Sequence, residues 1–501
     1  WEIPIQNWWA AHGGTYSWKV SDTANPTYQD VTPFTKGVSY TFTCWAITTS
    51  GAGQARIGID DGVDITYSSI SSATVWTQLS VTKTLSIAST RFRLLLDIEY
   101  AESNYFDDAA ISVGAITTGA PIDYANFNSN MYVVLGSVLC KVDTTAGATL
   151  KAVAVFATNP TAIIPSLNNC LYVYMGDTVN YYYMSTSELF TQTNVTDASR
   201  GAQWDAKLFK MDNDGNCWYA TTPNAAAPTW TATGNITDLT SGAVKRLFVG
   251  FDSTGDDVLC AAHTKGLKLL DFTGAAWLDT AIEFGDHPNA GKGAVRWRDA
   301  SYISAGLGVI KYVADSAVII EIGLNQDGGL PTEYNGEITN FIGANNTDLF
   351  ALVDSSQATG TTTSTLLSYN GKGWRCWWVG DSTEKAMVGG IVSSAYGYRL
   401  YFDHNSVVYY IDIPRGSENP RKLATTTYAA SGVHITPWFD ADWELGQKLA
   451  LSLRVRVDGA SATETVVVKY RINHTTTALE STWITLGTIT SSGTTIYQFP
   501  D

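Results

Sequence analysis

Short segments in which apolar and polar residues alternate fill this chain, and no other feature limits its possible folds as strongly. Typical examples are VSYTFTCWAI at residues 38–47 and TRFRLLLDI at residues 90–98. A period of two is that of a β-strand with one buried face. No apolar stretch with a period of 3.6 is long enough to predict a helix of several turns, so the sequence predicts an all-β protein. Two alternating sets are expected on a buried face: Tyr40, Phe42 and Cys44, and Phe92, Leu94 and Leu96.

Length and two changes of composition divide the chain into three expected domains. A chain of 501 residues exceeds the size at which a single core stops growing. Stretches typical of boundaries occur at residues 117–123 (TTGAPID) and 414–422 (PRGSENPRK). We therefore expect a β-sandwich over residues 1–116, a repetitive β domain over 117–430 and a small C-terminal β module over 431–501. With only about 70 residues this module has a marginal core, so it is expected to dock on the middle domain or on a second subunit.

At three places in the middle domain the spacing Gly-x-x-Trp follows an apolar strand. The pairs are Gly215 and Trp218, Gly274 and Trp277, and Gly371 and Trp374. This spacing suits a hairpin in which glycine takes a positive φ and tryptophan fills the wedge between neighbouring sheets. The glycines lie 59 and 97 residues apart, close to one and two four-stranded propeller blades. We expect a β-propeller of six or seven blades, with seven favoured; a long irregular array of sandwiches is the alternative.

The negative charge of the chain argues against nucleic acid as a partner. The formal net charge is −16 and the isoelectric point is near 4.8. Binding to a nucleic-acid backbone needs clustered Lys and Arg, so nucleic acid is not expected as a partner. No run of eighteen apolar residues occurs, and membrane insertion is not expected. The sequence begins at Trp1 instead of Met, which indicates a processed chain or a part of a longer polypeptide.

Motifs of catalysis are missing from the sequence. The six cysteines form no CxxC pair, and most sit in apolar strand-like runs, which indicates small core side chains, although a disulfide between two of them is left open. The six histidines show no HExxH spacing, and neither a GxSxG elbow nor a P-loop is present. A glycosidase needs two carboxylates at a defined separation, which the sequence does not pair. A non-enzymatic protein is expected.

Acidic residues near both ends of the first domain form a candidate metal site. Glu2 lies near the chain start, and Asp107 and Asp108 lie in the last strand. The first and last strands of a jelly roll are commonly neighbours, and Ca²⁺ prefers several oxygen ligands. The alternative is that these acids are solvated edge charges that deter strand pairing.

Aromatic residues of the first domain are candidates for sugar binding. A flat ring can stack on the apolar face of a pyranose while nearby polar groups bond its hydroxyls. The candidates are Trp8, Trp9, Trp18, Trp45 and Tyr67. Trp45 falls on the strand face opposite Tyr40 and Cys44. Burial in the core is the alternative for each tryptophan.

A family resemblance covers residues 1–113. The succession WEIP, GGTYSWKVS, YQDVTPFTKGVSYTFTCWA, VWTQLSVTKTL and YFDDAAI resembles the jelly-roll carbohydrate-binding modules often appended to glycoside hydrolases and phage tail proteins. The resemblance implies a jelly-roll fold. It also implies a structural Ca²⁺ near the chain start and at the acidic pair of the last strand, which favours Glu2, Asp107 and Asp108 as ligands.

The domain order resembles that of bacteriophage tail and tail-tip structural proteins. A sugar-binding-like jelly roll, a propeller with turns such as YNGKGW and a terminal sheet module follow one another. This resemblance implies a virion or extracellular structural component. Its partners would be other virion proteins, copies of itself, and a host or neighbouring surface glycan. The alternatives are a secreted propeller glycoside hydrolase and a bacterial surface adhesin.

Overall fold

The computed structural model forms two compact units, Trp1–Ile435 and Thr436–Asp501. It describes residues 12–13, 17–21, 26–100, 103–143, 149–165, 167–225, 227–236, 243–252, 254–271, 276–285, 287–306, 308–313, 318–324, 334, 336–344, 347–355, 364–380, 387–415, 422–424, 430–434, 436, 452–471 and 483–500. Apart from one short 3₁₀ turn, η1 (Leu167–Asn169), the named elements of these residues are β-strands. The prediction of an all-β protein is confirmed.

The first part of the chain folds into two four-stranded antiparallel sheets. One sheet has the order β1 (Trp18–Val20), β8 (Asn104–Val113), β3 (Ser39–Thr48) and β6 (Thr77–Thr84). The other has the order β2 (Thr27–Asp30), β7 (Arg93–Ile98), β4 (Ala55–Asp60) and β5 (Ile65–Tyr67). Apart from β4 and β5, which follow one another along the chain, neighbours within each sheet are distant in sequence, so connections pass from one sheet to the other.

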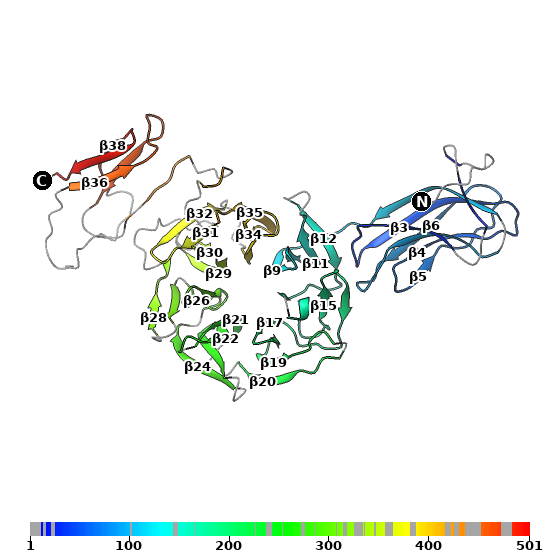
Figure 1. Ribbon diagram of the computed structural model, residues 1–501, viewed down its shortest axis with the longest axis horizontal. Coiled ribbons are helices and arrows are strands. Elements are labelled where there is room, and N and C mark those ends of the chain that lie inside the picture. Colours follow the sequence, from blue (N-terminus) through cyan, green and yellow to red (C-terminus); the bar gives the residue numbers. More distant parts are fainter. Residues whose placement is uncertain are drawn as a thin grey trace. The chain divides into compact units, whose positions relative to one another are not determined.

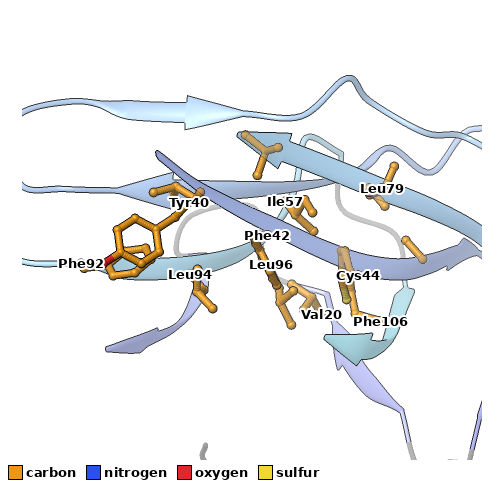
Figure 2. Packing of buried hydrophobic residues seen from close by; sticks show 14 of the residues in the cluster. Val20, Tyr40, Phe42, Cys44, Ile57, Leu79, Phe92, Leu94, Leu96 and Phe106 are labelled. Atoms are coloured by element: carbon orange, nitrogen blue, oxygen red, sulfur yellow. The ribbon is translucent and has the colours of Figure 1, made fainter. Parts of the chain in front are cut away.

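One hydrophobic core joins these two sheets into a sandwich. Every second residue of β3 is buried, from Tyr40 through Phe42 and Cys44 to Ala46. Figure 2 shows the side chains of Tyr40, Phe42 and Cys44 together with those of Leu94 and Leu96 from the other sheet. All six residues that the alternation predicted to be buried belong to this cluster, so that prediction is confirmed.

Seven antiparallel sheets follow along the chain. The first three consist of β9 (Pro121–Phe127), β10 (Asn130–Leu135), β11 (Val138–Val142) and β12 (Leu150–Val155); β13 (Ala162–Pro165), β14 (Cys170–Tyr174), β15 (Tyr182–Ser185) and β16 (Phe190–Gln192); and β17 (Arg200–Trp204), β18 (Lys207–Met211), β19 (Asn216–Ala220) and β20 (Thr231–Asn235). The next two consist of β21 (Val244–Phe251), β22 (Asp257–His263), β23 (Gly266–Asp271) and β24 (Ala276–Glu283); and β25 (Ala294–Trp297), β26 (Ala300–Ala305), β27 (Gly308–Val313) and β28 (Val318–Glu321). The last two consist of β29 (Glu337–Ala344), β30 (Leu349–Asp354), β31 (Ser364–Tyr369) and β32 (Trp374–Val379); and, within the described residues, β33 (Gly390–Ser393), β34 (Arg399–His404) and β35 (Val407–Asp412).

These sheets form a closed ring, as the blades of a β-propeller do (Figure 1). The first strand of each sheet contacts the first strand of the next, and β33 contacts β9. Side chains link the two ends of the ring. The Asn126 amide donates to the carbonyl of Val392 over 2.8 Å. The hydroxyl of Tyr124 in β9 lies 3.5 Å from the carboxylate of Asp403 in β34. This buried carboxylate also accepts the backbone amides of Val388 and Gly389 in its own sheet, over 2.9 and 2.7 Å.

The three Gly-x-x-Trp segments do not occupy equivalent places in the ring. Gly215 precedes the third strand of its sheet, β19, whereas Gly371 precedes the fourth, β32. Both glycines have a positive φ, of 85° and 94°. Gly274 lies outside the described residues. Position 274 falls between β23 and β24 in the sequence. The interval from Gly215 to Gly274 therefore spans one blade and one additional strand, and the prediction that it spans a single blade is wrong.

The tryptophans of the three segments pack differently as well. Trp374 and Trp277 belong to hydrophobic clusters, each built from two neighbouring sheets. The indole of Trp374 also donates to the carbonyl of Ile322 over 2.9 Å. Trp218 is half-buried, with the Lys210 ammonium 4.6 Å from its ring centre.

The second unit contains two antiparallel pairs of strands among its described residues. β36 (Ser452–Val457) pairs with β39 (Gly493–Gln498), and β37 (Val466–Tyr470) pairs with β38 (Ile484–Ile489). Among its described residues, only Val468 and Ile489 are buried hydrophobic side chains. This agrees with the marginal core expected from its length.

All six cysteines are free thiols, and five of them are buried. Burial raises the pKa of the Cys44 thiol to about 12, as expected of a core side chain. Cys376 differs because it is exposed. In the described part of the chain, no helix has the length and apolar character needed to cross a membrane.

Candidate functional site

The predicted site residues of the first domain separate into three groups. Glu2, Trp8 and Trp9 lie outside the described residues. Trp18 is half-buried and packs against the sandwich core. The remaining residues lie on the outer faces of the two sheets: Asp107, Asp108 and Trp45 on one, and Tyr67 on the other.

Asp107 and Asp108 lie at a β-bulge in which β8 departs from its register with β3. The shift falls between Thr43 and Trp45, and Asp108 takes a φ of 47° there. Oδ2 of Asp107 accepts the backbone amides of His12 and Gly13, over 2.8 and 3.1 Å. Its Oδ1 accepts the amide of Asp108 over 2.9 Å. The carboxylate of Asp107 therefore anchors the N-terminal segment, a role that sequence reasoning did not assign.

The ring of His12 covers Trp45. The two rings are stacked, with centroids 3.8 Å apart, and Nδ1 of His12 lies 2.8 Å from Oδ2 of Asp108. The edge of Trp76 completes the group, 5.9 Å from the His12 ring centre. The ring face that Trp45 would offer to a sugar is thus occupied by a side chain of the same protein.

A row of four residues crosses the outer face of the other sheet, and we call it the tyrosine platform. Tyr28 pairs with Leu95, Leu95 with Gly58, and Gly58 with Tyr67, so the row includes one residue from each strand. A Cβ atom on Gly58 would lie 2.8 Å from Cδ1 of Tyr67. Glycine at this position therefore lets the ring of Tyr67 lie across the sheet.

Two arginines hold the tyrosines of the platform. The guanidinium of Arg56 lies 4.2 Å from the ring centre of Tyr67, and its Nε is 2.7 Å from the Asp97 carboxylate. Arg93 repeats this arrangement at the other end, 4.1 Å from the ring centre of Tyr28 and 2.7 Å from Asp30. Burial, followed by the charge of Asp97, raises the pKa of the Tyr67 phenol. Its hydroxyl therefore remains a hydrogen-bond donor at neutral pH.

The platform combines the features that a sugar needs from a protein surface. Tyr28 is half-exposed and Tyr67 half-buried, so both rings reach solvent from an otherwise ordered sheet. Rings can stack on the apolar face of a pyranose, and the exposed carboxylate of Asp30, paired with Arg93, can bond its hydroxyls. Of these residues, only Tyr67 was predicted as a candidate. The others could be found only with the pairing of β2, β7, β4 and β5, which joins segments distant in sequence.

No family model matches this chain, and no curated protein is similar to it in sequence. Several solved structures align with part of this chain. A streptogramin B lyase structure aligns with 11% identity and a TM-score of 0.42, covering 59% of this chain and 94% of the lyase. The WD40 β-propeller domain of Doa1 aligns with 10% identity and a TM-score of 0.42, covering 62% and 97%. The extracellular domain of a putative one component system from B. thetaiotaomicron aligns with 11% identity and a TM-score of 0.45, covering 60% and 39%.

Proposed function

We propose that this protein is a non-enzymatic structural component of a virion, such as a phage tail or tail tip, whose first domain binds a surface glycan. In this proposal the first domain is a jelly roll, the middle domain is a seven-bladed propeller, and the glycan binds at the tyrosine platform. The single observation that carries glycan binding is the row of Tyr28, Leu95, Gly58 and Tyr67. Rigid β-strands hold both rings in place before the ligand arrives, which lowers the entropic cost of binding.

Truncation of the platform tyrosines tests glycan binding. A glycan array with the full chain identifies a ligand, and calorimetric titration then compares Tyr67→Ala and Tyr28→Ala with the unchanged protein. Each loss of a stacking ring is expected to weaken binding by roughly tenfold, about 1.4 kcal/mol. Tyr100→Ala is the matched control because Tyr100 is exposed in the same domain but lies outside the platform. Equal affinity in all four proteins would refute the platform as the binding surface.

The virion and non-enzymatic parts of the proposal have tests of their own. Electron microscopy of particles labelled with antibody to this chain should show decorated virions or filaments, and undecorated particles would contradict the proposal. Turnover of chromogenic glycosides at high protein concentration would instead favour a glycoside hydrolase.

A structural Ca²⁺ at the N-terminal segment also belongs to this proposal. Carboxylate oxygens suit Ca²⁺, and Asp107 and Asp108 lie beside residues 12 and 13. The hydrogen bonds that Asp107 already accepts leave Asp108 as the better placed of the two ligands. Chelation should lower the melting temperature of the full chain, and Asp108→Asn should remove that effect. A melting temperature that chelation does not change would exclude a structural metal.

A further inference from the structure

Polar side chains from three sheets converge at one end of the ring. Lys245 and Arg246 lie near the start of β21, while Glu337 begins β29 and Asn340 follows in the same strand. Asn289 and Lys292 lie in the segment that leads into β25. We call these six residues the rim cluster. Each belongs to the first strand of a sheet or to the segment just before it.

Two side chains of the rim cluster, those of Arg246 and Asn340, meet on the inner side of the ring. Nη1 of Arg246 donates to Oδ1 of Asn340 over 3.0 Å. Their strands, β21 and β29, are not neighbours, because β25 lies between them. A direct bond between them therefore passes in front of β25, on the side of the ring centre. Arg246 and Asn340 are both half-buried, so solvent reaches this bond.

A second chain of contacts lies beside this bond. Nζ of Lys292 donates to Oδ1 of Asn289 over 2.6 Å, and Nδ2 of Asn289 donates to Oε2 of Glu337 over 2.6 Å. The other oxygen of Glu337 lies 3.3 Å from Nε2 of His287. Cationic groups and a buried carboxylate thus stand together, with amide groups between them.

Positive charge predominates among the ionised groups of the rim cluster. Lys245, Arg246 and Lys292 are cationic, whereas Glu337 is the one carboxylate in the cluster. The carboxyl group of Asp123 in β9 also interacts with the charge of Arg246, and burial raises the pKa of this carboxyl. Across the part of the chain that the structure describes, no carboxylate forms an ion pair with Lys245. Partial desolvation and the neighbouring Lys245 ammonium lower the pKa of Lys292. A chain with a net charge of −16 therefore gathers like charges here, which favours an anionic ligand.

The rim cluster combines cations with a carboxylate and amide groups, and this combination favours one kind of anion over another. Inorganic phosphate at neutral pH offers mainly acceptor oxygens, so the carboxylate of Glu337 would oppose it. A sugar acid carries one carboxylate for the cations and several hydroxyls that can donate to Glu337 and to the Asn340 carbonyl. From this match we propose that the rim cluster binds the carboxylate-bearing residue of an acidic saccharide. This site is independent of the tyrosine platform and goes beyond the glycan binding proposed there.

Titration of the full chain with simple sugar acids tests the inference. NMR titration with glucuronic, galacturonic and N-acetylneuraminic acids is expected to show saturable binding of at least one acid. The neutral sugars glucose and galactose are expected to show no saturable binding. Lys245→Gln and Lys292→Gln should each weaken binding by roughly tenfold, and Lys245→Arg should retain it. Lys151→Gln is the matched control, since Lys151 is an exposed lysine of β12 outside the cluster.

Further variants separate the possible outcomes. Glu337→Gln should weaken the sugar acid but not inorganic phosphate, because only the sugar donates hydroxyls to this position. Tyr67→Ala should leave the sugar acid bound, so failure of the platform and failure of the rim cluster are distinguishable. Binding that phosphate displaces equally well in every variant would overturn the proposal, as would the absence of saturable binding by all three acids.

Discussion

Asp403 is a buried acid of the last sheet of the ring whose protonation depends on pH. Burial raises the pKa of its carboxyl from 3.8 to about 6, although the amides of Gly389 and Val388 act in the opposite direction. Because the folded pKa is above the unfolded one, the folded state binds the extra proton. The stability that this group contributes is fully present below about pH 4 and is lost as the pH rises through 6. Linkage gives a loss of about 3 kcal/mol by neutral pH.

We therefore predict that Asp403→Asn flattens the pH dependence of stability. Asparagine does not titrate, and its carbonyl can still accept one of the two amides. The unfolding free energy of the variant should fall by about 3 kcal/mol less than that of the unchanged protein between pH 4 and pH 7. Urea unfolding across this range measures the difference. Asp205→Asn, at an exposed acid, should leave the slope as it was. Parallel curves for Asp403→Asn would contradict the buried, proton-binding carboxyl.

For single residues, the sequence predicted which face of a strand they occupy but not their contacts with distant parts of the chain. The alternation in VSYTFTCWAI was sufficient to place Trp45 outside the core, because the period of two fixes the face of each residue. It did not reveal that His12 covers that ring, since the stacking brings together residues that no sequence pattern connects. Asp107 illustrates the same limit, with its carboxylate bound to backbone amides of His12 and Gly13.

At the scale of elements, the tyrosine platform depends on one glycine in β4. An added Cβ in Gly58→Ala would meet Cδ1 of Tyr67 at 2.8 Å and displace the ring. Glycan affinity should fall by roughly tenfold, with little change in melting temperature because Tyr67 is only half-buried. Gly51→Ala is the control, since a Cβ there meets nothing within 4 Å. Unchanged affinity for Gly58→Ala would show that the position of Tyr67 does not matter for binding.

The Gly-x-x-Trp segments give a second prediction about elements. Trp374 is buried in a cluster between two sheets and its indole is hydrogen-bonded, whereas Trp218 is half-buried against a lysine. Trp374→Ala should cost about 3–5 kcal/mol of unfolding free energy, and Trp218→Ala clearly less. Chemical denaturation of the two variants measures this order. Equal costs would mean that the shared spacing, and not the position in the sheet, determines the role of the tryptophan.

These segments also explain why the blade boundaries were hard to predict. The spacing correctly marked hairpins, because a turn with positive φ favours glycine wherever it occurs. Hairpins join both the second to the third and the third to the fourth strand of a sheet, so the same signal appeared at two different places. The first strands begin at residues 121, 162, 200, 244, 294, 337 and 390, at intervals too uneven for a simple sequence repeat.

At the scale of the whole molecule, strand content was predictable and the residue groups that we propose as binding sites were not. Alternation is a local property, so the sequence alone indicated an all-β chain. The rim cluster and the tyrosine platform both gather residues from separate strands through ring closure or sheet pairing. Such pairings are set by packing of whole sheets, to which many residues contribute a little. No short sequence motif therefore identifies either group of residues.

The division into two compact units leads to the last prediction. Trp1–Ile435 contains several large buried clusters, whereas the described residues of Thr436–Asp501 bury only two hydrophobic side chains. The second unit should unfold first, giving two calorimetric transitions. Ile489→Ala removes a side chain buried in the second unit and should lower only the earlier transition. Phe350→Ala removes one from the ring and should lower only the later transition, with about 3–5 kcal/mol lost. A single transition that both substitutions shift would mean that the two units unfold together.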